Sequence, residues 1–189
     1  MIYFDNAATT KPDKAVTAAV CECMENTFGN PSSLHKLGIE AQLVMDNARK
    51  NLASALNVPP ETLYFTSGAT ESSNLAIRGA AGAYGKRKKR VITTTVEHSS
   101  VKEAFNRLGD EGYEVIRISP GKDGKFSVKD FTDAVNDDTC LISVMFVNNE
   151  TGELLPVKNI FAEAKRKNKD IITHCDAVQA FMKIPVKPV

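Results

Sequence analysis

The chain has 189 residues, enough for one ordinary domain or one layer of a larger one. With 42% apolar and 25% charged residues it has the composition of a globular protein with a real core, and its formal charge of +1 gives no reason to expect nucleic acid or a membrane surface as partner. No apolar run reaches about 18 residues, and Met1–Asp5 lacks a signal-peptide pattern, so we expect a cytoplasmic protein.

Helical periodicity covers residues 14–27 and 38–56, and Pro59-Pro60 stops the second stretch. Strand-like and helical segments then alternate. The strand-like segments are 63–66, 90–96, 114–119, 139–147 and 170–175, and the helical segments between them are 71–84, 99–111, 128–136 and 157–168. This alternation predicts an α/β fold with a mostly parallel sheet and helices on both faces. The nearly continuous apolar run Leu141–Val147 fits a strand buried on both faces.

The four cysteines form no Cys-x-x-Cys pair. Cys21 and Cys23 lie two apart in a helical stretch, so they point to different faces and suit neither a disulfide nor zinc. Cys140 and Cys175 lie in apolar strand-like runs, where buried free thiols are common. We therefore expect four reduced, structural cysteines and no metal site.

The basic run Lys86–Arg90 closes a helical segment and leads into a strand. Cations are favourable near a helix C-terminus, so we interpret this run as a solvated edge. Nucleic-acid binding is the alternative, and the nearly neutral total charge argues against it.

The segment Leu63–Ala76 predicts a strand-to-helix corner with Ser67-Gly68-Ala69-Thr70 at the turn. The first turn of a helix offers unpaired N–H donors and the positive end of the helix dipole, which suits an anion such as phosphate. The hydroxyls of Thr70 and Ser67 would be extra donors. The segment is neither a Walker A loop nor a GxGxxG motif, and a plain corner capped by Ser or Thr is the alternative interpretation.

Polar residues follow several of the predicted strands, at the edge where an open parallel sheet binds its ligands. They are Thr70, Glu97-His98, Asn148-Asn149-Glu150, and Asp176 with Gln179. Asp176 either caps a short helix over residues 177–180 or supplies a fixed anion that keeps a ring nitrogen protonated, as pyridoxal 5'-phosphate (PLP) requires.

The other strand-end residues also carry two interpretations each. His98 is either a cap or surface residue, or an acid–base group stacked on a cofactor ring. Asn149 either makes the turn in Asn-Asn-Glu-Thr-Gly or bonds the ring hydroxyl oxygen, and Gln179 can donate to the same oxygen.

Six motifs carry a resemblance that runs along essentially the whole chain. They are Tyr3–Thr10 (YFDNAATT), Phe28–His35 (FGNPSSLH), Thr66–Asn74 (TSGATESSN), Glu97-His98, Val147–Gly152 (VNNETG) and His174–Gln179 (HCDAVQ). In this order they resemble the NifS/IscS-type cysteine desulfurases, PLP enzymes of the class V aminotransferase family with fold type I. The resemblance implies the large domain of a PLP-dependent transferase, with residues 1–13 as an N-terminal arm or small-domain segment and 14–189 as part of the large domain.

The resemblance also implies roles for individual residues. Ala69 and Thr70 would meet the PLP phosphate, His98 would stack on the ring and move protons, Asn149 and Gln179 would address the ring oxygen, and Asp176 the ring nitrogen. The segments with Asn6, Ala7, Asn30 and Ser32 would border the substrate entrance. The implied reaction converts L-cysteine to L-alanine and an enzyme persulfide for iron–sulfur cluster assembly or tRNA thiolation, in a homodimer that passes sulfur to an acceptor or scaffold protein.

Two residues that this reaction needs in the family are not found in these 189 residues. No Ser-x-His-Lys motif with the Schiff-base lysine follows Asp176, and none of the four cysteines matches the persulfide-forming one. We therefore expect a fragment that lacks the later strands and the small domain, binds PLP weakly or not at all, and does not desulfurate cysteine by itself. The alternatives are selenocysteine lyase, another class V aminotransferase, or a non-catalytic chain that pairs with a second polypeptide.

Overall fold

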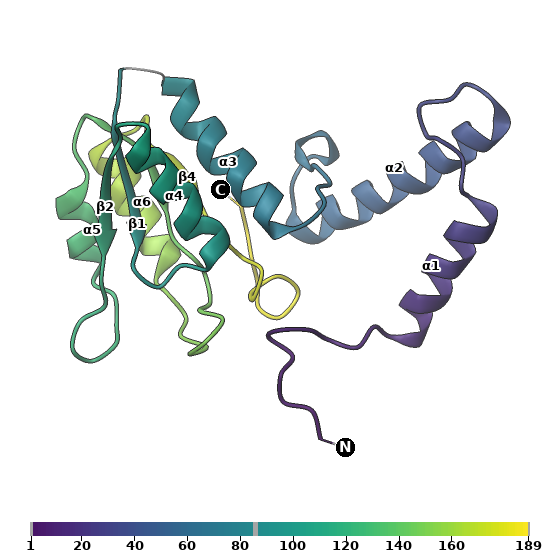
Figure 1. The fold of residues 1–189 in the computed structure, drawn as a ribbon, viewed down its shortest axis with the longest axis horizontal. Coiled ribbons are helices and arrows are strands. Elements are labelled where there is room, and N and C mark those ends of the chain that lie inside the picture. The colour runs from purple at the N-terminus through teal and green to yellow at the C-terminus, as the bar shows by residue number, and fades with distance from the viewer. Residues whose placement is uncertain (1, 85–86, 189) are drawn as a thin grey trace. The chain divides into compact units, whose positions relative to one another are not determined.

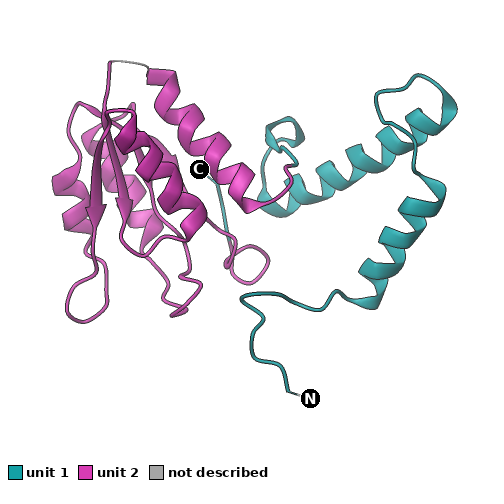
Figure 2. Cartoon of the chain, in the orientation of Figure 1, with its two compact units in different colours: residues 1–65, 186–189 teal, residues 66–185 magenta. Residues whose placement is uncertain are grey.

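The computed structural model describes residues 2–84 and 87–188, and the chain divides into two compact units (Figures 1 and 2). One unit comprises residues 1–65 and 186–189, and the other comprises residues 66–185. The boundary that the resemblance implies, after residue 13, stays a prediction.

The first unit contains the helices α1 (Lys14–Asn26) and α2 (Lys36–Leu56) and the short 3-10 helix η1 (Pro60–Thr62). Side chains cap both helices: Asp13 Oδ1 accepts the Ala15 N–H at 2.8 Å, and His35 Nδ1 accepts the Gly38 N–H at 3.3 Å. Helix α2 ends at Asn57, which has the left-handed conformation with φ 56°. These ends agree closely with the predicted helices.

The first unit buries few residues. Within α2 only Gly38, Ala41 and Ala53 are buried, and α1 has no buried residue. A Cβ at Gly38 would lie 2.2 Å from the Ser33 carbonyl oxygen, so only glycine permits the close approach of the loop that precedes α2. This unit therefore takes its form from local caps and turns.

The second unit is a four-stranded parallel sheet in the order β2-β1-β3-β4. Its strands are β1 (Arg90–Thr94), β2 (Glu114–Ile118), β3 (Thr139–Ser143) and β4 (Ile172–His174). Its helices are α3 (Ala69–Tyr84), α4 (Ser99–Asp110), α5 (Val128–Ala134) and α6 (Val157–Lys167). The arrows of β1 and β2 run side by side in the same direction in Figure 1. The predicted parallel α/β architecture is confirmed.

Helices cover both faces of this sheet. Because neighbouring residues of a strand point to opposite faces, each strand contributes side chains to two apolar clusters. Val91 belongs to the apolar cluster under α3 and α4, with Phe105 of α4 fully buried. Ile92 belongs to the cluster under α5 and α6, with Phe131 of α5 fully buried. Two cores on opposite sides thus fix the strands in place.

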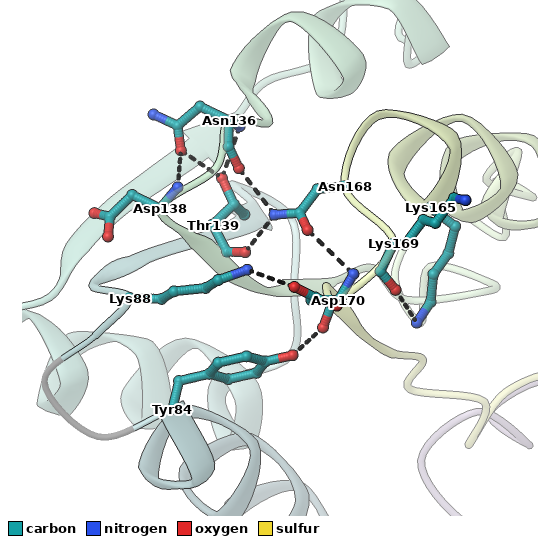
Figure 3. Close-up of polar contacts among 9 residues, drawn as sticks. All are labelled: Tyr84, Lys88, Asn136, Asp138, Thr139, Lys165, Asn168, Lys169 and Asp170. Atoms are coloured by element: carbon teal, nitrogen blue, oxygen red, sulfur yellow. Dashed lines mark hydrogen bonds and ion pairs between the residues drawn. The ribbon is translucent and has the colours of Figure 1, made fainter.

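A polar network holds the amino ends of β3 and β4 together (Figure 3). The Nδ2 of Asn168 donates to the carbonyl oxygens of Asn136 and Thr139, both at 3.0 Å, and its Oδ1 accepts the Asp170 N–H at 3.1 Å. The Tyr84 hydroxyl, at the end of α3, donates to the Asp170 carbonyl oxygen. Since the C-terminal end of α3 lies at this edge, its N-terminal end lies at the carboxyl edge of the sheet.

Two expectations from the sequence are corrected. The predicted strand over residues 63–66 is wrong: the segment is extended but pairs with no described strand, and a strand exists only with a neighbour for its backbone ladder. The basic run is more than a solvated edge. Lys88 pairs with Asp170 at 3.4 Å, and Arg90 makes two 2.8 Å bonds to Glu114. Lys86 lies outside the described residues.

All four cysteines are free, as expected. Cys21 and Cys23 are exposed on α1, Cys140 is buried in β3, and Cys175 is half-buried after β4. In the described part of the chain, every helix is too short or too polar to cross a membrane.

Candidate functional site

The order in which the parallel strands are added reverses between β1 and β3, at the carboxyl edge of the sheet. From β1 the chain proceeds to β2 on one side, then crosses to β3 and continues to β4 on the other side. In open α/β sheets such a switch point leaves a crevice beyond the strand ends, where ligands bind. His98 follows β1, Asn149 follows β3 and Asp176 follows β4, so the sheet brings these three predicted residues to one edge.

The N-terminus of α3 also lies at this edge. Within the described residues, no acceptor bonds the backbone N–H groups of Ala69 and Thr70, as expected in the first turn of a helix. Thr70 is exposed. Ser67, however, is not a donor for a ligand here: its N–H and hydroxyl both donate to Glu71 Oε2 at 2.6 Å, which lowers the pKa of Glu71. The anion-binding prediction therefore rests on Ala69 and Thr70.

His98 is an exposed cap of helix α4. Its Nδ1 accepts the Ser100 N–H at 3.2 Å and lies 2.8 Å from the Ser100 hydroxyl oxygen. Because Nδ1 accepts from the backbone, the neutral ring carries its proton on Nε2. The capping interpretation is thus correct, and it fixes the ring without using Nε2.

The loop after β3 assigns the turn-making role to Asn148, where the sequence placed it on Asn149. The buried Asn148 Oδ1 accepts from the N–H groups of Glu150 and Thr151 at 2.9 and 2.8 Å, and its Nδ2 donates to the Val96 carbonyl oxygen at 3.1 Å. The half-buried Asn149 side chain has no hydrogen bond within the described residues. Asn148 therefore shapes the loop, and the ligand-binding role of Asn149 stays a prediction.

Asp176 lies half-buried beyond the end of β4. Its backbone oxygen accepts the Phe146 N–H at 2.9 Å, and its Oδ1 accepts the Val178 N–H at 3.0 Å. The predicted short helix over 177–180 is wrong, because the chain forms turns from Val178 onward and no helix there. Gln179 Oε1 accepts from Lys183 Nζ at 2.9 Å.

Glu97 is the residue of this edge to which the sequence gave no role. Only 4% of it is exposed, and its Oε1 accepts the Thr94 hydroxyl at 2.8 Å and the Met145 N–H at 3.0 Å. Burial, with a smaller contribution from the charge of Asp176, raises the pKa of Glu97 to about 7. The sequence signal that could have identified Glu97 is an acidic residue directly between an apolar strand-like run and a helix-capping residue.

Ser143 of β3 and His174 of β4 form a polar pair on the side of the sheet that α3 and α4 cover. The register pairs Ser143 with His174, and Ser143 Oγ lies 2.8 Å from His174 Nδ1. Burial of the ring lowers the pKa of His174, which disfavours a cationic imidazole beside Asp176. Cys175, between them, has its pKa raised by burial to about 12, which excludes it as a thiolate nucleophile near neutral pH.

The predicted substrate-entrance residues belong to the first unit. Asn30 Oδ1 accepts the Ser32 N–H at 2.9 Å in the loop before α2, and Asn6 Nδ2 lies 3.5 Å from the Tyr3 carbonyl oxygen. Ala7 lies in the turn that follows Asn6. Their role at an entrance stays a prediction.

Comparison with known proteins identifies the family. Residues 2–188 match the model described as aminotransferase class-V. The cysteine desulfurase IscS of Photobacterium profundum is 42% identical over 188 residues, which are 98% of this chain and 46% of that protein. The mitochondrial cysteine desulfurase of Eremothecium gossypii is 41% identical over 186 residues, 98% of this chain and 38% of that protein.

A solved structure described as a NifS-like protein has a TM-score of 0.95 at 39% identity, covering 98% of this chain and 51% of that chain. The chain therefore belongs to the aminotransferase class-V family. The resemblance to NifS/IscS proteins is confirmed, and the chain spans less than half the length of these two curated relatives.

Proposed function

We propose that this chain forms the PLP-binding part of a cysteine desulfurase, which releases L-alanine from L-cysteine and keeps the sulfur on the enzyme. The proposal depends on one observation: His98, Asn149, Asp176 and the N-terminus of α3 all lie at the same edge of the sheet. The chain also belongs to a family that matches this function. The cysteine desulfurase names of the relatives support the substrate.

The side chains at this edge fit PLP by their chemistry. The unpaired N–H groups of Ala69 and Thr70, with the Thr70 hydroxyl, suit its phosphate. The Asp176 carboxylate suits its protonated ring nitrogen, and the amides of Asn149 and Gln179 suit its ring oxygen. When bound, PLP supplies an electron sink for negative charge at the substrate Cα.

His98 is the acid–base group of the proposal. Its Nδ1 is occupied by Ser100, so Nε2 is the ring atom that exchanges a proton with the substrate. The exposed ring is reachable from solvent. Asn6, Ala7, Asn30 and Ser32 are assigned to the entrance by the resemblance.

Binding is tested with pyridoxine 5'-phosphate, which lacks the PLP aldehyde and so cannot couple to surface lysines. We expect Asp176→Asn to weaken binding by about tenfold or more, equivalent to about 1.4 kcal/mol. The matched control is Asp170→Asn, since Asp170 lies at the opposite edge of the sheet. Equal affinities of the two variants would contradict the assignment.

Turnover is a separate test, because the 189 residues contain no Ser-x-His-Lys motif. We expect the chain mixed with PLP and L-cysteine to release neither sulfide nor alanine above the PLP-only background. Appreciable turnover by the chain would show that another of its residues replaces the lysine.

The alternative is a non-catalytic chain that pairs with a second polypeptide supplying the lysine. We propose a homodimer, as the resemblance implies, and gel filtration of the purified chain distinguishes it from a hetero-complex. The family relation further supports delivery of sulfur to an acceptor or scaffold protein for iron–sulfur cluster assembly. We propose a cytoplasmic location, to be tested by cell fractionation, although the Eremothecium gossypii relative is named mitochondrial.

A further inference from the structure

Glu97 lies where the sheet opens at its switch point. The ladder between β1 and β3 pairs Ile92 with Ile142 and continues no further. Beyond it, the Met145 N–H donates to Glu97 Oε1 at 3.0 Å, and the Thr94 hydroxyl donates to the same oxygen at 2.8 Å. The carboxyl thus replaces a strand partner and joins the ends of β1 and β3 as they separate.

The extension of β3 is held from its other side by Asp176. The Phe146 N–H, next to Met145 in the chain, donates to the Asp176 backbone oxygen at 2.9 Å. Glu97 and Asp176 therefore hold two consecutive residues from opposite sides. The charge of Asp176 raises the pKa of Glu97, and both residues bind the same two-residue segment.

The second oxygen of Glu97 has no hydrogen-bond partner in the described part of the chain. Its Oε2 is buried, and no hydrogen bond reaches it from the described residues. A buried charged oxygen without a donor is costly, whereas a protonated one is neutral. The Thr94 hydroxyl and the Met145 N–H both donate to Oε1. This pattern suits a neutral acid in which Oε1 is the carbonyl oxygen and Oε2 carries the proton.

Asp176 is the charged group that contributes to the shift of the Glu97 pKa. Asp176 and Cys175 both follow β4; the charge of Asp176 disfavours ionisation of Glu97, and the charge of Glu97 disfavours ionisation of Cys175. Among the described residues, no cation is a cause of the shift of the Glu97 pKa.

We propose that Glu97 is a positioning residue of the site, a neutral carboxylic acid with its proton on Oε2 that joins the ends of β1 and β3 and leaves Asp176 as the anion of the edge. The inference rests on the proposed function only in assigning the Asp176 charge to a ligand. With Glu97 neutral, that charge is available to a protonated ring nitrogen, and the loops that follow β1 and β3 keep their spacing.

The protonation state is measured by carbon NMR of the chain labelled at the glutamate and aspartate carboxyls. Glu97→Gln assigns the signal. We expect the Glu97 carboxyl to titrate near pH 7, and Asp176→Asn to move its midpoint to lower pH because a neighbouring charge is removed. A midpoint near 4.5, the ordinary value, would overturn the inference whether or not PLP binds.

The positioning role is measured with pyridoxine 5'-phosphate at pH 6, below the pKa of about 7, so that Glu97 is mostly protonated. A neutral amide has the same shape as the proposed acid, so Glu97→Gln should bind the probe within about threefold of the wild type, while Glu97→Ala should bind about tenfold more weakly. A tenfold loss in Glu97→Gln would show that an ionised carboxylate is required and would overturn the inference, as would unchanged binding by a folded Glu97→Ala. If the wild type does not bind the probe, the proposed function fails and the carboxyl titration alone decides the state of Glu97.

Discussion

The raised pKa of Glu97 makes the stability of the chain depend on pH in a defined direction. The folded chain keeps the Glu97 proton up to about pH 7, whereas the unfolded chain releases it near 4.5. Between these values the folded state binds more protons, so the free energy of unfolding falls as pH rises. Below pH 4.5 the two states do not differ at this residue, and above pH 7 the loss is complete.

The magnitude follows from the width of that interval. Each pH unit within it costs about 1.4 kcal/mol. From 4.5 to about 7, the wild type should therefore lose about 3 kcal/mol of stability relative to Glu97→Gln, which cannot titrate. Because Glu97 is 4% exposed, solvent screening reduces this figure little.

Urea denaturation followed by far-UV circular dichroism, at pH values from 4.5 to 8, measures this difference. The comparison with Glu97→Gln removes the contribution of every other titrating group. Parallel pH profiles for the two proteins would refute the reasoning, because they would mean that Glu97 ionises with an ordinary pKa in the folded chain.

Two further predictions concern the amino edge and the cysteines. Asn168→Ala should lower the free energy of unfolding by about 2–4 kcal/mol, because it leaves two carbonyl oxygens and one N–H without their partner. The exposed Asn106→Ala is its control, and urea denaturation should place that variant within about 0.5 kcal/mol of the wild type. Iodoacetamide at pH 8, followed by peptide mass spectrometry, should modify Cys21 and Cys23 quickly and the other two only in urea. Modification of Cys175 at the rate of Cys21 would contradict its burial.

The sequence predicted the elements of the second unit well because their signals are local. Helical periodicity and apolar runs placed α3 to α6 and β1 to β4 within a few residues of their observed ends. The run 63–66 has the same composition as a strand, but strand formation depends on a partner, and composition does not contain that information.

The candidate site was predictable only in outline. Parallel strands bring their following residues to one edge, which was enough to group His98, Asn149 and Asp176. Which of two neighbouring residues takes which role was not predictable. Asn148 rather than Asn149 makes the turn, and Glu71 accepts the hydroxyl of Ser67. The sequence placed Glu97 at this edge but gave it no role, because its role depends on burial and on a donor 48 residues away, the Met145 N–H.

The most direct test of the proposed site is amide NMR of the labelled chain during titration with pyridoxine 5'-phosphate. We predict that the shifts concentrate at Ala69 and Thr70, beside His98 and Asn149, and around Asp176. Shifts confined to the opposite edge, around Asn168, or an absence of saturable shifts at the α3 N-terminus would contradict a PLP site at the carboxyl edge of this sheet.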